Sequence, residues 1–347
     1  MSNTLPRVSI IIPCRNEAGW IERCLASVAA NDYPKDRLEI LIVDGLSDDG
    51  TPAILETLAA EHPHVRVLEN PNRTAPAALN IGITEANGDV IMRMDAHNEY
   101  SDKYISSLVN WLQRSGADNV GGRWVTQPGD DSVMARAIVV VLTHRFGVGG
   151  AHYRFEVNEP RSVDTVPFGC YRRSVFDKIG LFDEELVRNQ DLEFNLRLRK
   201  HGGSILLVHG AESRYHARTS LRKACRMTFL NAYFSPLVMR KLGGTINIRQ
   251  LVPAAFVVAL VSLGILATLS PLGTAAFALL LAAYLLPAGT IALRAALMHG
   301  LRCGMNVFVL FPLIHISHGL GFLKGVLDFI VLRRSYKKKA NTMKITR

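Results

Sequence analysis

Asp95 and His97 stand two residues apart and have the side-chain chemistry to hold a divalent cation. They follow an apolar run, Val90 to Met94, that is typical of a buried strand. Side chains at i and i+2 of an extended segment point the same way, so the carboxylate and the imidazole can face one ligand. Such a pair suits Mn²⁺ or Mg²⁺ bound to a phosphate. A polar turn that merely ends a strand would look the same, so the pair needs support from elsewhere in the chain.

Two more apolar runs also end in polar clusters. Residues 8–12 are followed by Pro13 to Glu17, and residues 39–43 are followed by Asp44 to Asp49. Helices are expected over 20–30, 51–61 and 74–86, and a further strand over 65–69. This alternation predicts an α/β unit with a parallel sheet and right-handed crossovers. Because ligands bind beyond the carboxyl ends of such strands, the three polar clusters are expected at one edge.

The glycine-rich dinucleotide fingerprint is missing after the first run, and Walker A is missing from the chain. The absence argues against a dinucleotide-binding Rossmann domain. A nucleotide bound here would therefore be held by carboxylates and backbone, with a metal on its phosphates.

Residues 118–212 predict a mixed α+β segment, in which Asn189-Gln190-Asp191 opens a helix. Asp191 lies in the first turn, where the helix dipole favours an acid, so capping explains it as well as chemistry does. Glu193 lies on a different face and is predicted to be an ordinary surface acid.

The charge and the cysteine content limit the possible classes of protein. The 347 residues carry 40 Lys plus Arg and 30 Asp plus Glu, a net charge of +10, and no acid occurs from 213 to 327. Five scattered cysteines indicate neither a zinc site nor a disulfide framework, which favours a reducing compartment. The apolar run near the N-terminus is too short for a signal peptide.

The last third of the chain predicts a membrane region over 251–332. Residues 251–269 and 275–293 are apolar enough to cross a bilayer as a hairpin, and 304–323 is a weaker third segment that re-enters or lies along the membrane. Cations flank the hairpin on both sides, so both flanks and the basic tail, 333–347, are expected in the cytoplasm. The basic, aromatic segment 213–250 is expected to bind lipid phosphates at the interface rather than nucleic acid.

Taken together, these motifs resemble glycosyltransferase family 2, whose members have the GT-A fold. The resemblance covers about residues 7–226 and rests on the apolar strand with Pro13 and Glu17, Val43-Asp44-Gly45 with residues 47–51, Ala77 to Asn80 with Gly82, Asp95-Ala96-His97, and Asn189-Gln190-Asp191. The Asp-Ala-His triplet and the membrane tail are most similar to the succinoglycan ExoA type. Members of that group add a sugar to a polyprenyl-diphosphate-linked oligosaccharide in bacterial exopolysaccharide assembly.

The resemblance implies a role for each matching position. Asp44 would bind the base or ribose of the nucleotide, with Pro13 and Glu17 lining the same pocket. Asp95 is the first acid of the family's Asp-x-Asp metal motif, and His97 replaces the second.

Asp191 matches the family's catalytic base, and Gln190 replaces the Glu before it. Arg73 and Asn80 would shape the donor pocket, although solvation at the surface explains Arg73 equally well. The Gln-x-x-Arg-Trp sequence of processive synthases is absent, and Arg218 is the nearest basic position for a diphosphate.

The sequence therefore predicts a GT-A glycosyltransferase domain over 1–212 in the cytoplasm, anchored to the bacterial inner membrane. It would move a sugar from a UDP-linked donor to a lipid-linked acceptor, with Mn²⁺ or Mg²⁺ as cofactor and one base for an inverting transfer. Two alternatives stay open: a transferase that glycosylates polyprenyl phosphate, and a non-catalytic membrane scaffold of a polysaccharide assembly complex.

Overall fold

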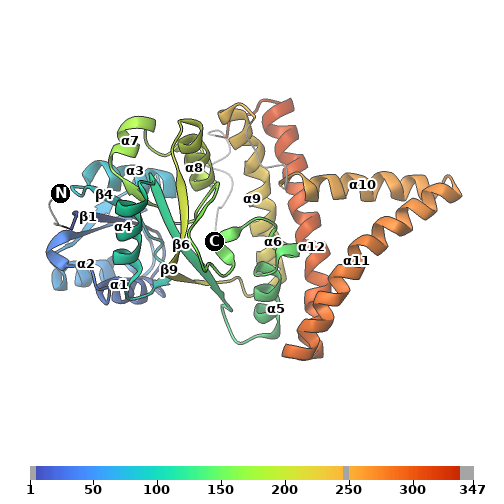
Figure 1. Cartoon of the computed structure of the whole chain (residues 1–347), viewed down its shortest axis with the longest axis horizontal. Helices are drawn as coiled ribbons and strands as arrows, with labels where there is room; N and C mark the ends of the chain where they lie inside the picture. The colour runs from blue at the N-terminus through green and yellow to red at the C-terminus, as the bar shows by residue number, and fades with distance from the viewer. Residues whose placement is uncertain (1–4, 245–249, 337–347) are drawn as a thin grey trace. The chain divides into compact units, whose positions relative to one another are not determined.

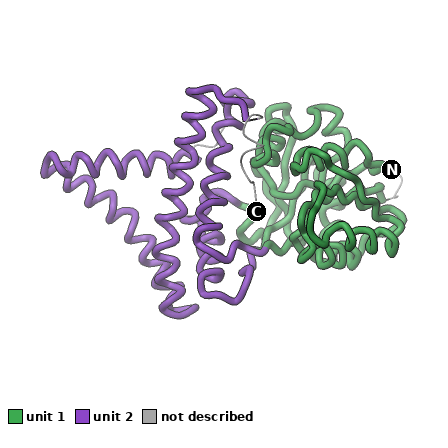
Figure 2. Tube along the Cα trace, turned by 180° about the vertical axis from the view of Figure 1, so that it is seen from behind, with its two compact units in different colours: residues 1–125, 152–215 green, residues 126–151, 216–347 purple. Residues whose placement is uncertain are grey.

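The computed structural model describes residues 5–244 and 250–336, so Arg249 and most of the predicted tail lie outside the described residues. The chain forms two compact units, one of residues 1–125 and 152–215 and the other of residues 126–151 and 216–347 (Figure 2). These units are defined by packing alone. The domain boundaries predicted from the sequence, after residues 212, 250 and 332, stay predictions.

The first unit is built on a nine-stranded sheet in the order β3-β2-β1-β4-β8-β6-β9-β5, with β7 paired to β9. Its strands are β1 Val8–Cys14, β2 Leu38–Asp44, β3 Val65–Glu69, β4 Val90–Arg93, β5 Asn98–Tyr100, β6 Asn119–Gln127, β7 Arg161–Ser162, β8 Cys170–Arg172 and β9 Ile205–His216. β1 to β4 are parallel, as predicted, and β8 joins β4 antiparallel. The result is a mixed sheet with a parallel half and an antiparallel half.

Helices cover both faces of this sheet (Figure 1). They are α1 Ile21–Ala29, α2 Thr51–Glu61, α3 Ala75–Glu85, α4 Tyr104–Ser115, α7 Ser174–Ile179 and α8 Gln190–Lys200, with 3-10 turns η1 Lys35–Arg37 and η2 His152–Arg154. Because strand side chains alternate, Ile10 and Ile12 of β1 pack with α1 and α4, while Ile11 packs with α3, α7 and α8. β1 is therefore buried on both sides, which explains its continuous apolar sequence.

The second unit is helical. It contains α5 Val133–Leu142, α6 Arg145–Val148, α9 Leu221–Leu242, α10 Val252–Ala267, α11 Pro271–His299, α12 Leu301–Gly325 and the π-helical turn η4 Val326–Val331. α12 packs along α9 at Gly321 and Gly325, where an added Cβ would collide with the carbonyl groups of Phe229 and Tyr233. Glycine is needed at these two positions because the helix backbones approach so closely.

Two described helices are long and apolar enough to cross a membrane, Pro271–His299 and Leu301–Val331, while α10 is shorter at 16 residues. α10 and α11 form a helical hairpin (Figure 1). Leu279 and Leu286 of α11 are 71% and 69% exposed, and only 11% of the most apolar 18-residue stretch of that helix is buried. A core helix of a soluble protein would bury these leucines, so the exposed apolar surface fits membrane anchoring.

Candidate active site

The carboxyl ends of β1 and β2 meet, with Cys14 of β1 paired to Asp44 of β2. Asp44 accepts hydrogen bonds from the backbone N–H and the hydroxyl of Ser47, and its side chain remains partly exposed. Asn16 exchanges two hydrogen bonds with Asp48, at 2.7 and 3.0 Å, which locks the loops after the two strands together. The sheet therefore presents Asp44 on a rigid edge.

Three other residues predicted to bind the nucleotide sugar lie near Asp44. Pro13 is buried inside β1, and Glu17 is buried while its N–H donates to Thr51 Oγ1 at 2.8 Å. Arg73 is exposed, with φ of 55°, and its Cα faces Gly45 beside Asp44. The structure thus brings Pro13, Glu17 and Arg73 to the same edge as Asp44.

Asn80 has a different setting. Its side chain donates to the carbonyl of Phe182 at 2.9 Å and to Glu184 at 3.0 Å, and it accepts from the Phe182 N–H at 2.9 Å. These bonds fasten the loop after α7 to α3. A contact between Asn80 and the donor stays a prediction.

Asp95-Ala96-His97 forms the turn between β4 and β5 rather than the end of an extended strand. The backbone of Asp95 is held by Tyr100, whose hydroxyl accepts from the Asp95 N–H at 2.7 Å. Ala96 is fully buried, while the side chains on either side of it are partly exposed. Both possible ligands therefore come from the same tight turn and are partly open to solvent.

Asp191 lies in the first turn of α8, and its Oδ1 accepts the N–H of Leu192 at 2.9 Å. Its Oδ2 lies 3.8 Å from Nη1 of Arg93, whose Nη2 donates to Asp95 Oδ1 at 3.1 Å. One arginine thus stands between the predicted metal ligand and the predicted base.

Burial raises the pKa of Asp191 above its usual range, and the Arg93 guanidinium opposes that rise. A third of the side chain remains open to solvent, at 33%, which limits the effect of burial. The carboxylate is thus set up as a stronger base than an ordinary exposed aspartate.

Glu193 corrects one prediction. It is 3% exposed rather than a surface acid, and it forms an ion pair with Arg197 at 2.8 Å. Arg197 also donates to the carbonyl groups of Ile179 and Leu181. The pair fastens α8, which carries Asp191, to the end of α7; the helical periodicity alone placed Glu193 on the wrong surface.

Sequence reasoning missed several neighbours of the site. Trp124, Tyr153 and Tyr215 surround the guanidinium of Arg154, 4.5 to 5.7 Å from the ring centres, and Tyr215 meets the ring of His97 edge-on at 6.4 Å. No spacing rule links these residues. Arg93 did carry a signal, because it is a cation within an otherwise apolar strand.

The side chains at this edge of the sheet offer few ligands for a divalent cation. Among residues 5–244 and 250–336, no group of three or more His, Cys, Asp or Glu could hold a metal ion. Asp95 and His97 can supply two ligands from one turn. Mg²⁺ in phosphate sites is typically held by one or two protein ligands and completed by substrate phosphates, and Mn²⁺ accepts similar ligands, so the pair fits a cation that arrives with a diphosphate.

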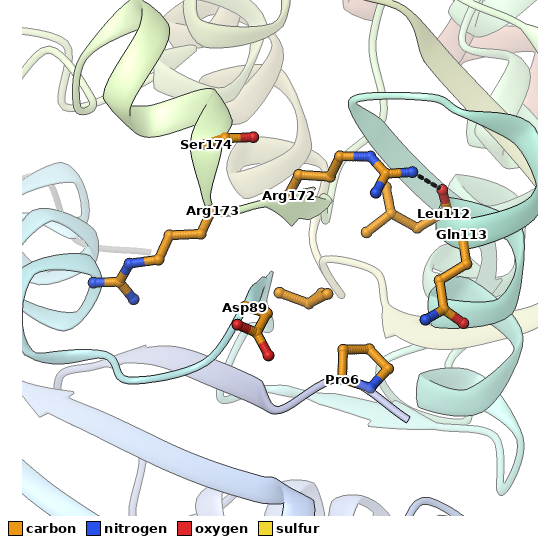
Figure 3. Close-up of a pocket in the computed structure, with 8 residues that line it drawn as sticks. Pro6, Asp89, Leu112, Gln113, Arg172, Arg173 and Ser174 are labelled. Atoms are coloured by element: carbon orange, nitrogen blue, oxygen red, sulfur yellow. Dashed lines mark hydrogen bonds between the residues drawn. The ribbon is translucent and has the colours of Figure 1, made fainter. Parts of the chain in front are cut away.

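A cavity of about 300 Å³ lies elsewhere in the first unit, between the starts of β1 and β4 and the end of β8 (Figure 3). Arg172 crosses it to donate to the carbonyl of Leu112, and Arg173 points away toward the carbonyl of Ala86. Both guanidinium groups bond to the backbone. Because the cavity lies at the starts of the parallel strands, it is separate from the carboxyl edge where the predicted site lies.

Arg218 belongs to the second unit, two residues before Ser220, which caps α9. Its contact with a diphosphate stays a prediction.

The fold and the cluster of acids at its carboxyl edge define a glycosyltransferase of the GT-A class. Residues 9–180 match the family described as Glycosyl transferase family 2. The chain belongs to this family, and the protein is a glycosyltransferase.

Two curated relatives and one solved structure show how far the similarity extends. A dolichyl N-acetyl-alpha-D-glucosaminyl phosphate 3-beta-D-2,3-diacetamido-2,3-dideoxy-beta-D-glucuronosyltransferase of Methanococcus voltae is 30% identical over 264 residues, 74% of this chain and 80% of the relative. The succinoglycan biosynthesis protein ExoA of Rhizobium meliloti is 32% identical over 214 residues, 61% and 64% of the two chains. The mannosyltransferase PcManGT of Pyrobaculum calidifontis, solved with GDP-Man and Mn²⁺, is 20% identical and covers 92% of this chain and 88% of its own, with a TM-score of 0.59, which shows the shared fold.

Proposed function

We propose that this protein is an inverting, metal-dependent glycosyltransferase that moves a sugar from a UDP-linked donor to a polyprenyl-diphosphate-linked oligosaccharide. The observation that carries the proposal is the placement of Asp95 and Asp191 on either side of Arg93, at 3.1 and 3.8 Å. Donor activation and proton removal must occur around one anomeric carbon, so the two acids are required close together.

In this mechanism Asp44, Pro13 and Glu17 position the nucleotide, and Asp95 with His97 would hold the cation. The cation, when bound, supplies positive charge to the leaving diphosphate. Asp191 accepts the proton of the acceptor hydroxyl as that oxygen bonds to the anomeric carbon and the bond to the nucleoside diphosphate breaks. One base suffices, and no covalent intermediate with the enzyme is needed.

The acceptor class is supported by the relatives and by the helices. The archaeal relative is named for a dolichyl-phosphate-linked sugar, and ExoA for succinoglycan biosynthesis. The exposed leucines of α11 give this chain a means of staying beside a lipid-linked acceptor. Bacterial exopolysaccharide assembly at the inner membrane is part of the proposal because of the similarity to ExoA. The catalytic unit is proposed to lie in the cytoplasm because cations flank the apolar hairpin.

The test is UDP release by membranes that contain the protein, measured with a panel of nucleotide sugars and with Mn²⁺ or Mg²⁺. Each donor is offered with lipid-linked oligosaccharides and with bare polyprenyl phosphate. We expect one donor to be turned over in a metal-dependent reaction that both Asp95→Ala and Asp191→Asn abolish. Asp177→Asn, at an exposed position on α7, is the matched control and should retain activity.

Two results would contradict the proposal. Turnover with bare polyprenyl phosphate that survives Asp191→Asn would show transfer to phosphate, which needs no base. No turnover with any donor, in a protein that inserts and folds normally, would leave the proposed substrates without support.

A further inference from the structure

Arg93 is a buried cation in a strand whose other members, Val90, Ile91 and Met92, are apolar. Its exposed fraction is 8%. A guanidinium removed from water is costly unless it is paired, so a buried arginine requires partners.

The partners of the Arg93 guanidinium differ from those of three partly buried arginines in the same unit. Arg172, Arg173 and Arg197 each donate to backbone carbonyl groups and so join segments of the chain. Within the described residues, the hydrogen bond of Arg93 goes to Asp95, while its Nε and Nη1 have no hydrogen-bond partner. Nη1 instead faces Asp191 at 3.8 Å.

The remaining contact of the guanidinium is the ring of Phe168, 5.7 Å from the ring centre. The ring is buried in the hydrophobic core on one face of the sheet. In the described chain, the guanidinium of Arg93 donates to no backbone carbonyl group. Its charged contacts are the two acids of the site.

We infer that Arg93 is a positioning residue that holds Asp95 and Asp191 on the two arms of one guanidinium and thereby fixes their separation. The inference rests on the proposed function. A planar fork with donors in fixed directions can address two carboxylates at once, whereas an ammonium is a point charge on a flexible stem. The acid at the donor diphosphate and the base at the acceptor then keep one relative position through the reaction.

The charges around Asp191 allow the role to be measured. The groups that interact electrostatically with its carboxylate are Arg93 from β4, Asp95 from the turn after it, Tyr153 from η2 and Tyr171 from β8. Burial raises the pKa of both tyrosines, so they stay neutral at working pH. Removing the Arg93 charge would leave Asp191 facing the negative charge of Asp95.

The experiment compares Arg93→Met, Arg93→Lys and the wild type by the pH profile of kcat/KM, and by kcat and donor KM measured separately. We expect Arg93→Met to shift the acid limb of the kcat/KM profile to higher pH, by about one pH unit or more. We also expect it to lower kcat by roughly 10²-fold, as for a misplaced catalytic group. Arg93→Lys should keep the acid limb near that of the wild type, because the charge remains, but should still lose kcat because the fork is gone.

Arg172→Met is the control, since Arg172 is a partly buried arginine on the neighbouring strand β8, paired with Val90 at the start of β4. Thermal unfolding, and binding of Mn²⁺ with UDP followed by the electron paramagnetic resonance of free Mn²⁺, report whether each variant is folded with a formed donor site. An acid limb unchanged in Arg93→Met, or full recovery of kcat in Arg93→Lys, would overturn the inference. A wild-type protein without turnover would instead overturn the proposed function, so the two failures are distinguishable.

Discussion

His97 is the position at which this chain departs from the acid pair of its family. Imidazole suits transition metals better than it suits Mg²⁺, which prefers oxygen ligands. The partly exposed ring beside Asp95 therefore favours Mn²⁺ if it binds the cation directly.

We predict that His97→Asp shifts the preference of the enzyme from Mn²⁺ toward Mg²⁺, because a carboxylate replaces the nitrogen ligand. The measurement is the ratio of kcat/KM with the two metals. His201→Asp, which adds the same acid at an exposed position, is the control. An unchanged ratio would mean that His97 does not bind the metal.

The raised pKa of Asp191 gives a second prediction at this scale. A base must be ionised to accept a proton, so kcat/KM should fall as pH drops through the pKa of Asp191. Since burial raises that pKa, the fall should begin at a higher pH than an ordinary aspartate would give. Activity that stays flat down to the usual aspartate range, near pH 3.9, would contradict the assignment of Asp191 as base.

At the scale of elements, Asn80 and Glu193 hold the segments that surround the base. Asn80 ties the loop after α7 to α3, and Glu193 pairs with Arg197, which bonds to the end of α7. Both contacts support α8, the helix that carries Asp191.

We predict that Asn80→Ala lowers the free energy of unfolding by about 1–3 kcal/mol, because buried backbone groups of the loop lose their partner. Chemical denaturation measures this change. Thr84→Ala, one turn further along α3 at an exposed position, is the control. A large rise in donor KM with little loss of stability would favour instead the donor-pocket role predicted from the sequence.

At the scale of the whole molecule, the apolar surface of α11 must be covered by something other than water. Leu279, Leu286 and Leu293 recur every seven residues and are 71%, 69% and 62% exposed. The spacing places them along one side of the helix.

We predict that the full chain stays with membranes through alkaline carbonate washing and that Leu286→Arg weakens this retention. An arginine near the centre of a span costs about 2.5–3.5 kcal/mol in insertion. Leu46→Arg, at an exposed loop position of the first unit, is the control. Release of the wild-type protein by carbonate would contradict anchoring by α11.

Much of the site could be predicted from the sequence because its signals are local. An apolar run followed by a polar cluster marks the end of a buried strand, and parallel strands bring such ends to one edge. The positions of Asp44 and Asp95 on that edge follow from this rule.

Only the tertiary structure decided which side chains face each other. Asp191 lies 96 residues after Asp95 (191 − 95), and β8 must pair beside β4 and α8 must pack on the sheet before the two acids can share Arg93. The burial of Glu193 was decided in the same way, by packing against α7. Periodicity reports the environment of a residue within its own element, whereas contacts between distant elements depend on how their surfaces fit.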